Sequence, residues 1–369
     1  MSQSAKVERF GHTKSRTLAA VVAASLILAV GLSAVATAST KTAVKKPKPP
    51  VYTSANISLQ VNPPVGSDLG TYLLQWIATV KKESKGKINI TPYYQGQLYT
   101  NVTSVPAVQS GALDLDLIDI GTLSSTLPAF GAAVLPFAGA DYAQIEQFTG
   151  PTSPVYTWLS RYAPHEHLVL FPTPVLIPGD QTVMLKAPIT SLEGLKGQSI
   201  RSIGGSFDKL FSGLGANPVD LPASSVPTAL QAGTVTGALG SLSVMTTTWK
   251  GLGNTAVDLG TVLLTGYYMV ANSGDWGNLS EADRTLLTTS YQGEFNVLKP
   301  QVASLQLNAL ATWTAISGNT VYNLTAADQA ELKPILAGIW TSFATAYPAT
   351  YNAVLKAVKK FKLQAYTPS

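Results

Sequence analysis

The sequence of 369 residues contains no cysteine, and only 12% of its residues are charged. Without cysteine the chain has no disulfide framework, no thiol nucleophile, no thiolate-bound zinc or iron–sulfur cluster, and no lipid-modified cysteine anchor. An average soluble protein carries charge on about 25% of its residues. Charged residues in this chain are therefore few, and each is a candidate for a specific role. Hydrophobic residues make up 46%, which is enough to fill the cores of two domains of ordinary size.

The positive charge is concentrated at the N-terminus. Residues 1–50 contain eight Lys/Arg and one acidic residue, a balance of +7, whereas the remaining 319 residues contain 17 basic and 19 acidic residues, a balance of −2. A nucleic-acid-binding domain would be expected to carry a basic patch of its own. We therefore predict no nucleic-acid partner for the main part of the chain.

The N-terminal segment has the pattern of an export signal. Basic residues precede the apolar run LAAVVAASLILAVGLSAVATA, which ends in small residues at Ala38. This pattern predicts a signal peptide at residues 1–38, a stiff basic linker at residues 39–54, and a periplasmic or other extracytoplasmic location. Because about 20 apolar residues can span a bilayer, an uncleaved N-terminal membrane anchor is the alternative.

Strand-like and helix-like segments alternate through most of the chain. NISLQVN, KINITPYY and LDLDLIDI alternate like strands, and DLGTYLLQWIATVKKESKG has apolar positions at helical spacing. Such alternation predicts parallel sheets covered by helices. After about Glu281 the pattern becomes helical, with Ser280 and Asp283 at the positions of a capping box and Pro300 as a candidate kink.

Motifs of enzymes and metal sites are missing from the sequence. No G-x-S-x-G, G-x-x-x-x-G-K-[ST] or H-E-x-x-H occurs. His165 and His167 are more typical of a solvated turn before a strand than of a metal site, and the acid pair Asp114 and Asp116 has no partner base. We therefore expect no catalytic activity, no cofactor and no metal, with an enzyme on the same fold as an alternative.

Six segments resemble, in order, motifs of the extracytoplasmic solute receptors of tripartite ATP-independent periplasmic (TRAP) transporters, the dicarboxylate-receptor family. YYQGQL resembles the family's Y-P-x-G-Q-L, and APITSLEGLKGQSIRSI resembles its K-x-P-I-x-x-x-x-D-L-K-G-x-K-I-R. The other four segments are VQSGALDLDLID, LPAFGAAVLPFAGADYAQ, LGANPVDLPASSVPTALQAGTVTG and LSEADRTLL. The resemblance covers about residues 56–360.

The resemblance implies an α/β fold, the two-lobe clamp of periplasmic binding proteins (type II-like), with a long C-terminal helix near Ala282–Leu310 that crosses both lobes. Lobe I would comprise residues 55–178 and 267–306, and lobe II residues 179–266 and 307–366. The implied function is capture of a small organic acid between the lobes and its delivery to TRAP-type membrane permease subunits, by a receptor that we expect to be a monomer. A ligand-sensing subunit of a periplasmic signalling system is the alternative.

The resemblance also implies a ligand-binding arginine. Arg201 in SIRSI matches the family's arginine that binds the ligand carboxylate, and a guanidinium offers paired donors in a plane that fits a carboxylate. A salt bridge within one domain is the alternative. In an open, unliganded cleft we expect this guanidinium to be hydrated. Trp249 and Tyr267 are candidate cleft aromatics, with burial in a core as the alternative.

Other positions depart from the family pattern. Asp180 or Gln181 stands where the family often has a second arginine, and Gly240 stands where it has an asparagine, with Ser241 beside it as a candidate. Asp119 ends a strand where the family usually has a small or polar residue. Extra acids would repel a dicarboxylate, so we expect a monocarboxylate that carries hydroxyl groups or an amine. The alternative is that both acids point to solvent.

Overall fold

The computed structural model describes residues 50–63, 67–138, 140, 142–176, 181–260, 262–263 and 266–366. The chain from Pro50 onward forms one compact unit. The predicted signal or anchor at residues 1–38 and residues 39–49 of the predicted linker lie outside the described residues. Within the described ranges, every helix is too short or too polar to cross a bilayer.

The first sheet has its strands in the order β2-β1-β3-β11-β4, and β5 pairs with β11. These strands are β1 (Ala55–Val61), β2 (Ile88–Tyr94), β3 (Leu115–Asp119), β4 (Leu168–Leu170), β5 (Val175–Leu176) and β11 (Gly266–Asn272). The strand β1 is parallel to β2 and β3, whereas β11 runs antiparallel to β3, β4 and β5.

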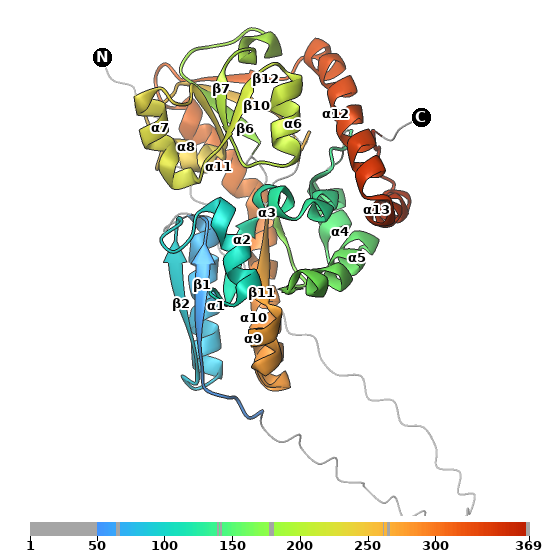
Figure 1. The fold of residues 1–369 in the computed structure, drawn as a ribbon. Helices are drawn as coiled ribbons and strands as arrows, with labels where there is room; N and C mark the ends of the chain where they lie inside the picture. The colour runs from blue at the N-terminus through green and yellow to red at the C-terminus, as the bar shows by residue number, and fades with distance from the viewer. Residues whose placement is uncertain are drawn as a thin grey trace, which may run out of the picture. The chain divides into compact units, whose positions relative to one another are not determined.

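The second sheet has the order β12-β10-β6-β9-β7-β8. These strands are β6 (Thr182–Leu185), β7 (Ser199–Ser202), β8 (Asn217–Asp220), β9 (Gly237–Gly240), β10 (Thr255–Asp258) and β12 (Thr320–Asn323). The strand β7 is parallel to both β8 and β9, and β6 runs antiparallel to β9 and β10. Figure 1 shows the two sheets in separate halves of this unit, which we call lobe I and lobe II after the first and second sheet.

Helices cover both sheets. The α-helices are α1 (Asp68–Glu83), α2 (Asn101–Ser110), α3 (Ile120–Thr126), α4 (Tyr142–Thr149), α5 (Pro154–Tyr162), α6 (Ser206–Gly213), α7 (Val226–Ala232), α8 (Leu242–Thr246), α9 (Ser273–Asn278), α10 (Glu281–Leu298), α11 (Val302–Thr314), α12 (Ala326–Ala346) and α13 (Pro348–Phe361). Short 3₁₀ turns lie at Pro128–Val134, Ala163–Glu166, Leu192–Leu195, Ala223–Ser225 and Lys299–Gln301. In lobe I, the indole of Trp76 on α1 packs edge-on against Tyr291 of α10, with the ring centroids 5.5 Å apart.

The sheets are mixed, although the sequence pattern predicted parallel sheets. The antiparallel members, β6 and β11, each come directly after a strand of the other sheet in the order of elements. The parallel strands end where the two sheets face each other, so a strand that comes directly from a strand of the other sheet starts at that edge and runs away from it. By contrast, β12 follows the helices α10 and α11 and is parallel to β10. Alternation of apolar and polar residues does not record strand direction, so the sequence could not reveal this.

A pair of helices connects the two lobes (Figure 1). Helix α10 packs against α1 of lobe I, and α11 packs against α8 of lobe II. The predicted kink is confirmed, because a 3₁₀ turn over Lys299–Gln301 interrupts the helix at Pro300. The capping box of Ser280 and Asp283 at the start of α10 is also confirmed.

The last two helices also span both lobes. Helix α12 packs against α6 of lobe II, whereas α13 packs against α4 and α5 of lobe I. The sequence-based boundaries assigned residues 307–366 to lobe II as a block. Helix α13 packs on lobe I instead. The remaining boundaries stay a prediction.

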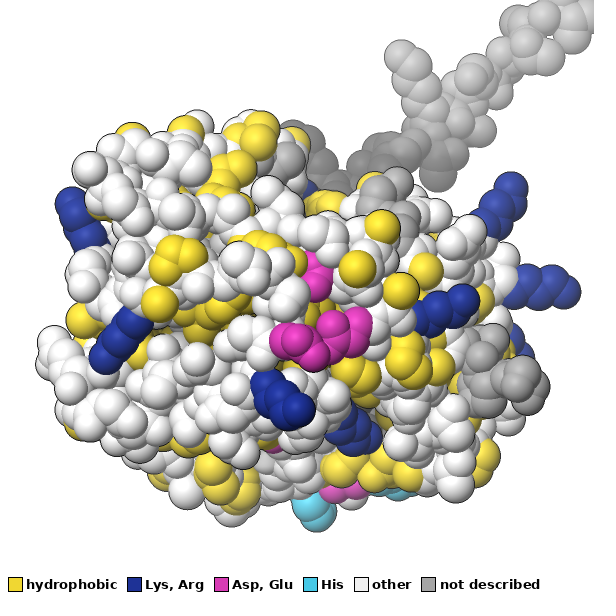
Figure 2. Space-filling view, turned by 90° about the horizontal axis from the view of Figure 1, so that it is seen from above, with side chains coloured by type: hydrophobic (Ala, Val, Ile, Leu, Met, Phe, Trp, Pro, Cys, Tyr) yellow, Lys and Arg dark blue, Asp and Glu magenta, His cyan; other side chains and the backbone are white. Residues whose placement is uncertain are grey.

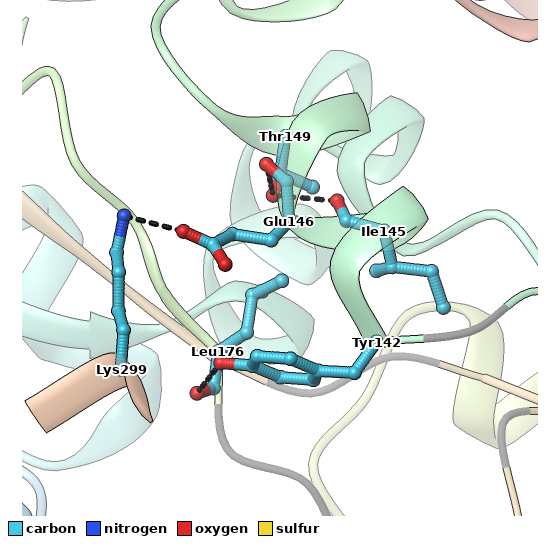
Figure 3. A network of polar contacts seen from close by, with 6 residues as sticks. All are labelled: Tyr142, Ile145, Glu146, Thr149, Leu176 and Lys299. Carbon is cyan, nitrogen blue, oxygen red and sulfur yellow. Dashed lines mark hydrogen bonds and ion pairs between the residues drawn. The ribbon is translucent and has the colours of Figure 1, made fainter. Parts of the chain in front are cut away.

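Helix α4 anchors two places at which the chain leaves one sheet for the other (Figure 3). Lys299, in the turn between α10 and α11, forms an ion pair with Glu146 of α4. The hydroxyl of Tyr142, also on α4, donates to the carbonyl of Leu176 at the end of β5, with an O–O distance of 2.7 Å. Two connections between the lobes are thereby tied to one helix of lobe I.

Candidate functional site

A cavity of about 140 Å³ lies between the two sheets. From lobe I it is lined by residues that follow β1 and β2, among them Asn62 and Gln95, and by Asp119 at the end of β3. From lobe II it is lined by Arg201 of β7 and by Ser241, which follows β9. Ligands of open α/β sheets bind at the carboxyl ends of parallel strands, and here those ends from both sheets line one cavity.

Arg201 is held between its two neighbouring strands. Its Nε donates to the carbonyl oxygen of Leu221, just after β8, at 2.8 Å, and its Nη1 donates to the carbonyl oxygen of Leu239 in β9 at 2.7 Å. The side chain is only 6% exposed. The expectation of a hydrated guanidinium is therefore wrong, because backbone carbonyls replace water around part of it.

Trp249 lines the cavity and also belongs to a core. The Cζ of Arg201 lies 5.9 Å from the centroid of its ring, within the range of a cation–π contact. The indole nitrogen donates to the carbonyl of Ala223 at 3.3 Å. A Cβ at Gly240 would lie 2.5 Å from this indole. The ring of Trp249 therefore occupies the space that a side chain would need at the position of the family's asparagine.

Asp119 and Tyr267 lie directly opposite each other in the antiparallel pair of β3 and β11, and both line the cavity. The Asp119 carboxylate caps helix α3, because its Oδ1 accepts hydrogen bonds from the backbone N–H groups of Gly121 at 2.7 Å and Thr122 at 3.3 Å. Directly opposite residues of an antiparallel pair project to the same face of the sheet. The acid and the aromatic ring therefore share one side of the cavity.

The three remaining sequence candidates are Ser241, Gln181 and Asp180, and of the two that the structure describes only Ser241 is placed at the cavity. Ser241 lines the cavity and caps α8, where its Oγ accepts from the backbone N–H of Val244 at 3.3 Å. Gln181 is buried outside the cavity lining, and its carbonyl accepts from the N–H of Leu259. The proposal of Gln181 as a ligand-binding residue is not supported by this position. Asp180 lies outside the described residues.

The two glycines that follow Arg201 allow lobe II to approach lobe I closely. Gly204 has a φ of +82°, and a Cβ there would overlap the hydroxyl of Ser125 on α3. Gly205 faces Ser124 of the same helix in the same way. Both glycines therefore permit the backbone after β7 to lie against α3, next to the cavity.

Sequence reasoning missed Asn101, a lining residue at the start of α2. Its side chain forms a hydrogen bond with Asp220 of β8, so this pair links the two lobes. Burial and the negative charge of Asp208 raise the pKa of Asp220, and the positive charge of Arg201 and the bond from Asn101 oppose that rise. The only signal in the sequence was the helix start at "TNVTSV", which does not indicate a partner across a cleft.

Metal chemistry has no support in the part of the chain that the structure describes. No cluster of three or more His, Asp or Glu side chains among these residues could hold an ion. The expectation of no metal and no cofactor stays a prediction.

Comparison with known proteins gives the family. Residues 60–346 match the family model described as bacterial extracellular solute-binding protein, family 7. A solute-binding protein from Albidiferax ferrireducens is 26% identical over 164 residues, which are 44% of this chain and 47% of that protein. The match thus spans about half the length of this curated relative.

Solved structures show the same two-lobe architecture. A TRAP solute-binding protein from a marine metagenome, specific for pyroglutamate, superposes with a TM-score of 0.75 at 21% identity over 84% of this chain and 100% of its own. A TRAP periplasmic protein from Sulfurospirillum deleyianum with bound succinate gives 0.73 at 19% identity over 83% and 98%. The prediction of a two-lobe α/β fold is confirmed, and the chain belongs to family 7 of the bacterial extracellular solute-binding proteins.

Proposed function

We propose that this protein captures a small organic acid with a single carboxylate in the cavity between its lobes and delivers it to a TRAP-type membrane permease. The observation that carries the proposal is the placement of Arg201. Among the described residues that line the cavity, it is the only lysine or arginine. It lies near the carboxyl end of β7, and its carbonyl contacts to both neighbouring strands fix the plane of the guanidinium. A fixed guanidinium plane suits two-point binding of a carboxylate.

Helix dipoles add to the preference for an anion. Asn101 at the start of α2 and Ser67 at the N-cap of α1 both line the cavity. The N-terminal end of an α-helix carries about half a positive charge. A carboxylate between the lobes would therefore lie near two positive helix ends as well as Arg201.

The cavity limits the size and charge of the ligand. A cavity needs about 10–15 Å³ to hold one water. A cavity of about 140 Å³ therefore suits a ligand of about ten non-hydrogen atoms. Asp119 is the only acidic side chain among the described lining residues. A second carboxylate would meet no second cation among them and would be repelled by Asp119, so we propose that dicarboxylates bind weakly.

The remaining expectations of partners and activity stay predictions. Lys and Arg side chains are spread over the face seen in Figure 2, and a group of acidic side chains lies near its middle. This distribution is consistent with a receptor that does not bind nucleic acid. We also propose that the receptor acts as a monomer outside the cytoplasm and does not convert its ligand.

The proposal is tested by Arg201→Gln, measured by calorimetric titration with small monocarboxylates and by uptake in cells that carry the permease. Loss of one partner of a desolvated charge pair costs about 2–5 kcal/mol, so affinity should fall about 30- to 5,000-fold. Arg201→Lys should restore part of it, because an ammonium group cannot make the planar contact.

Arg284→Gln is the matched control, because its Nη1 also donates to backbone carbonyls but lies outside the cavity lining. Both variants should lower the unliganded melting temperature, since each leaves carbonyls with fewer donors. Only the Arg201 variant should lose ligand affinity and uptake. Normal binding by Arg201→Gln would contradict the proposed function at its central residue.

A further inference from the structure

We infer that the ligand carries an apolar body beyond its carboxylate, such as a small hydrocarbon ring or a branched chain. This inference rests on the proposed function, since it concerns the other end of the same ligand. The observation behind it is an apolar wall made by helices of both lobes. The wall consists of Leu69 of α1, Leu242 and Val244 of α8, Leu298 of α10, and Leu305 and Ala309 of α11.

The wall joins two hydrophobic cores across the cavity. Leu69 and Leu298 belong to the core of lobe I, and Leu305 packs against that core. Leu242 belongs to a core of lobe II that also contains Trp249. A ligand that fills the cavity would therefore touch apolar surface from both lobes at once. Each buried methylene improves affinity by about fourfold through removal of apolar area from water.

Three polar side chains of the lining are already engaged in the fold, whereas the buried Nδ2 of Asn62 has no hydrogen-bond partner among the described residues. Ser67, Asp119 and Ser241 each accept hydrogen bonds from backbone N–H groups of the helix that they cap, α1, α3 and α8 respectively. Ligand hydroxyl groups or an amine would have to share these oxygens with the backbone. The sequence led us to expect such groups on the ligand, whereas the six wall residues favour a hydrocarbon body.

The first experiment uses calorimetric titration of the full chain to compare two acids that both have a five-membered ring. Cyclopentanecarboxylate has a hydrocarbon ring, whereas pyroglutamate replaces part of that ring by an amide. We expect cyclopentanecarboxylate to bind at least about tenfold more tightly, because burial of the amide without full hydrogen bonding is unfavourable. Succinate and the uncharged cyclopentanecarboxamide complete the set, and both should bind far more weakly.

The second experiment changes the wall. Leu305 is half-buried at the cavity, whereas Leu307 on the same helix is 66% exposed and outside the lining. Leu305→Gln should weaken cyclopentanecarboxylate by about tenfold and pyroglutamate by less. Leu307→Gln should leave both affinities unchanged. Unliganded melting curves of both variants report whether the fold is kept, and the comparison of ligands on the unaltered chain does not depend on either variant.

The outcomes separate the inference from the proposed function. If pyroglutamate binds as tightly as cyclopentanecarboxylate or more tightly, the apolar body is refuted and carboxylate capture stands. If cyclopentanecarboxamide binds as tightly as cyclopentanecarboxylate, the carboxylate site is refuted and the apolar body stands. If none of the four compounds binds, both are refuted. Tighter binding of cyclopentanecarboxylate, with selective weakening by Leu305→Gln, supports both.

Discussion

Asp116 is a fully buried acid at the second position of β3, three residues before the cavity residue Asp119. Neither of its carboxylate oxygens makes a hydrogen bond of good geometry with the described residues, although the hydroxyl of Ser104 lies close enough to interact. Burial raises the pKa of Asp116 from 3.8 to about 7, and the hydroxyl of Ser104 on α2 opposes the rise to a smaller extent. We predict that Asp116 is protonated in the folded protein at mildly acidic pH and that its ionisation destabilises lobe I.

The size and sign of the effect follow from the two pKa values. The unfolded chain loses this proton near pH 3.8, whereas the folded protein keeps it up to about pH 7. Unfolding therefore releases a proton between these values, and the contribution to stability falls as pH rises through that window. One pKa unit corresponds to about 1.4 kcal/mol, so the free energy of unfolding should fall by about 2 to 3 kcal/mol between pH 5 and pH 8.

The perturbation that isolates this effect is Asp116→Asn, which is uncharged at every pH. Urea unfolding of both proteins at steps between pH 5 and pH 8 gives the difference between their free energies of unfolding. The amide can add a constant cost, but only Asp116 can make the difference change with pH. We expect the difference to shift by about 2 to 3 kcal/mol in favour of the variant as pH rises.

The control is Glu331→Gln, an exposed carboxyl on α12. This variant measures how far removal of a surface carboxyl alone changes the free energy of unfolding over the same range. A difference between Asp116→Asn and the unaltered protein that stays constant from pH 5 to pH 8 would refute the reasoning. In that case Asp116 is ionised in the folded state and is solvated or paired at that position.

Two further predictions concern contacts that hold the lobes in shape. Gly204→Ala should lower both the melting temperature and the ligand affinity more than the control Gly233→Ala. Both positions have a positive φ, but only at Gly204 does a side chain, Ser125, occupy the space of the new Cβ. Equal melting temperatures of the two variants would show that the approach of this backbone to α3 is unimportant. Burial opposes ionisation of Asp328, but hydrogen bonds from Thr325, Tyr322 and the N–H of Leu192 outweigh it and lower its pKa to about 2. This stabilisation is present above about pH 4 and is lost as pH falls towards 2, so the unfolding curves of Asp328→Ala and the unaltered protein should differ at pH 7 and converge in acid; a constant gap would contradict this.

The sequence predicted what depends on local pattern and order along the chain. It predicted a strand around Arg201, and β7 covers that residue. It predicted the capping box at Ser280 and the break at Pro300, because both depend on residues that are adjacent or three apart. The succession of strands and helices, together with the six family-like segments, was enough to predict two lobes.

What the sequence could not predict depends on contacts between distant segments. The burial of Arg201 follows from carbonyls of Leu221 and Leu239, which are 20 and 38 residues away. The ring of Trp249 fills the space in which a side chain at Gly240 would lie. No sequence pattern relates these two positions. Gln181 was proposed as a ligand-binding residue because it or its neighbour Asp180 stands where the family often has a second arginine. Its position outside the cavity lining depends on how β6 enters the second sheet.

In this site, backbone carbonyls orient the arginine that binds the carboxylate, whereas side chains form the apolar wall. This difference affects how ligand specificity can change. The orientation of Arg201 depends on backbone carbonyls, which no substitution in the lining removes as long as β8 and β9 keep their places beside β7. The apolar wall, by contrast, consists of side chains on α1, α8, α10 and α11. Substitutions there can change the ligand's body while the carboxylate anchor stays in place. Of the wall residues, Leu305 and Ala309 of α11 and Val244 of α8 should therefore alter ligand preference with the least effect on stability, because these three are only half-buried, whereas Leu69, Leu242 and Leu298 are buried.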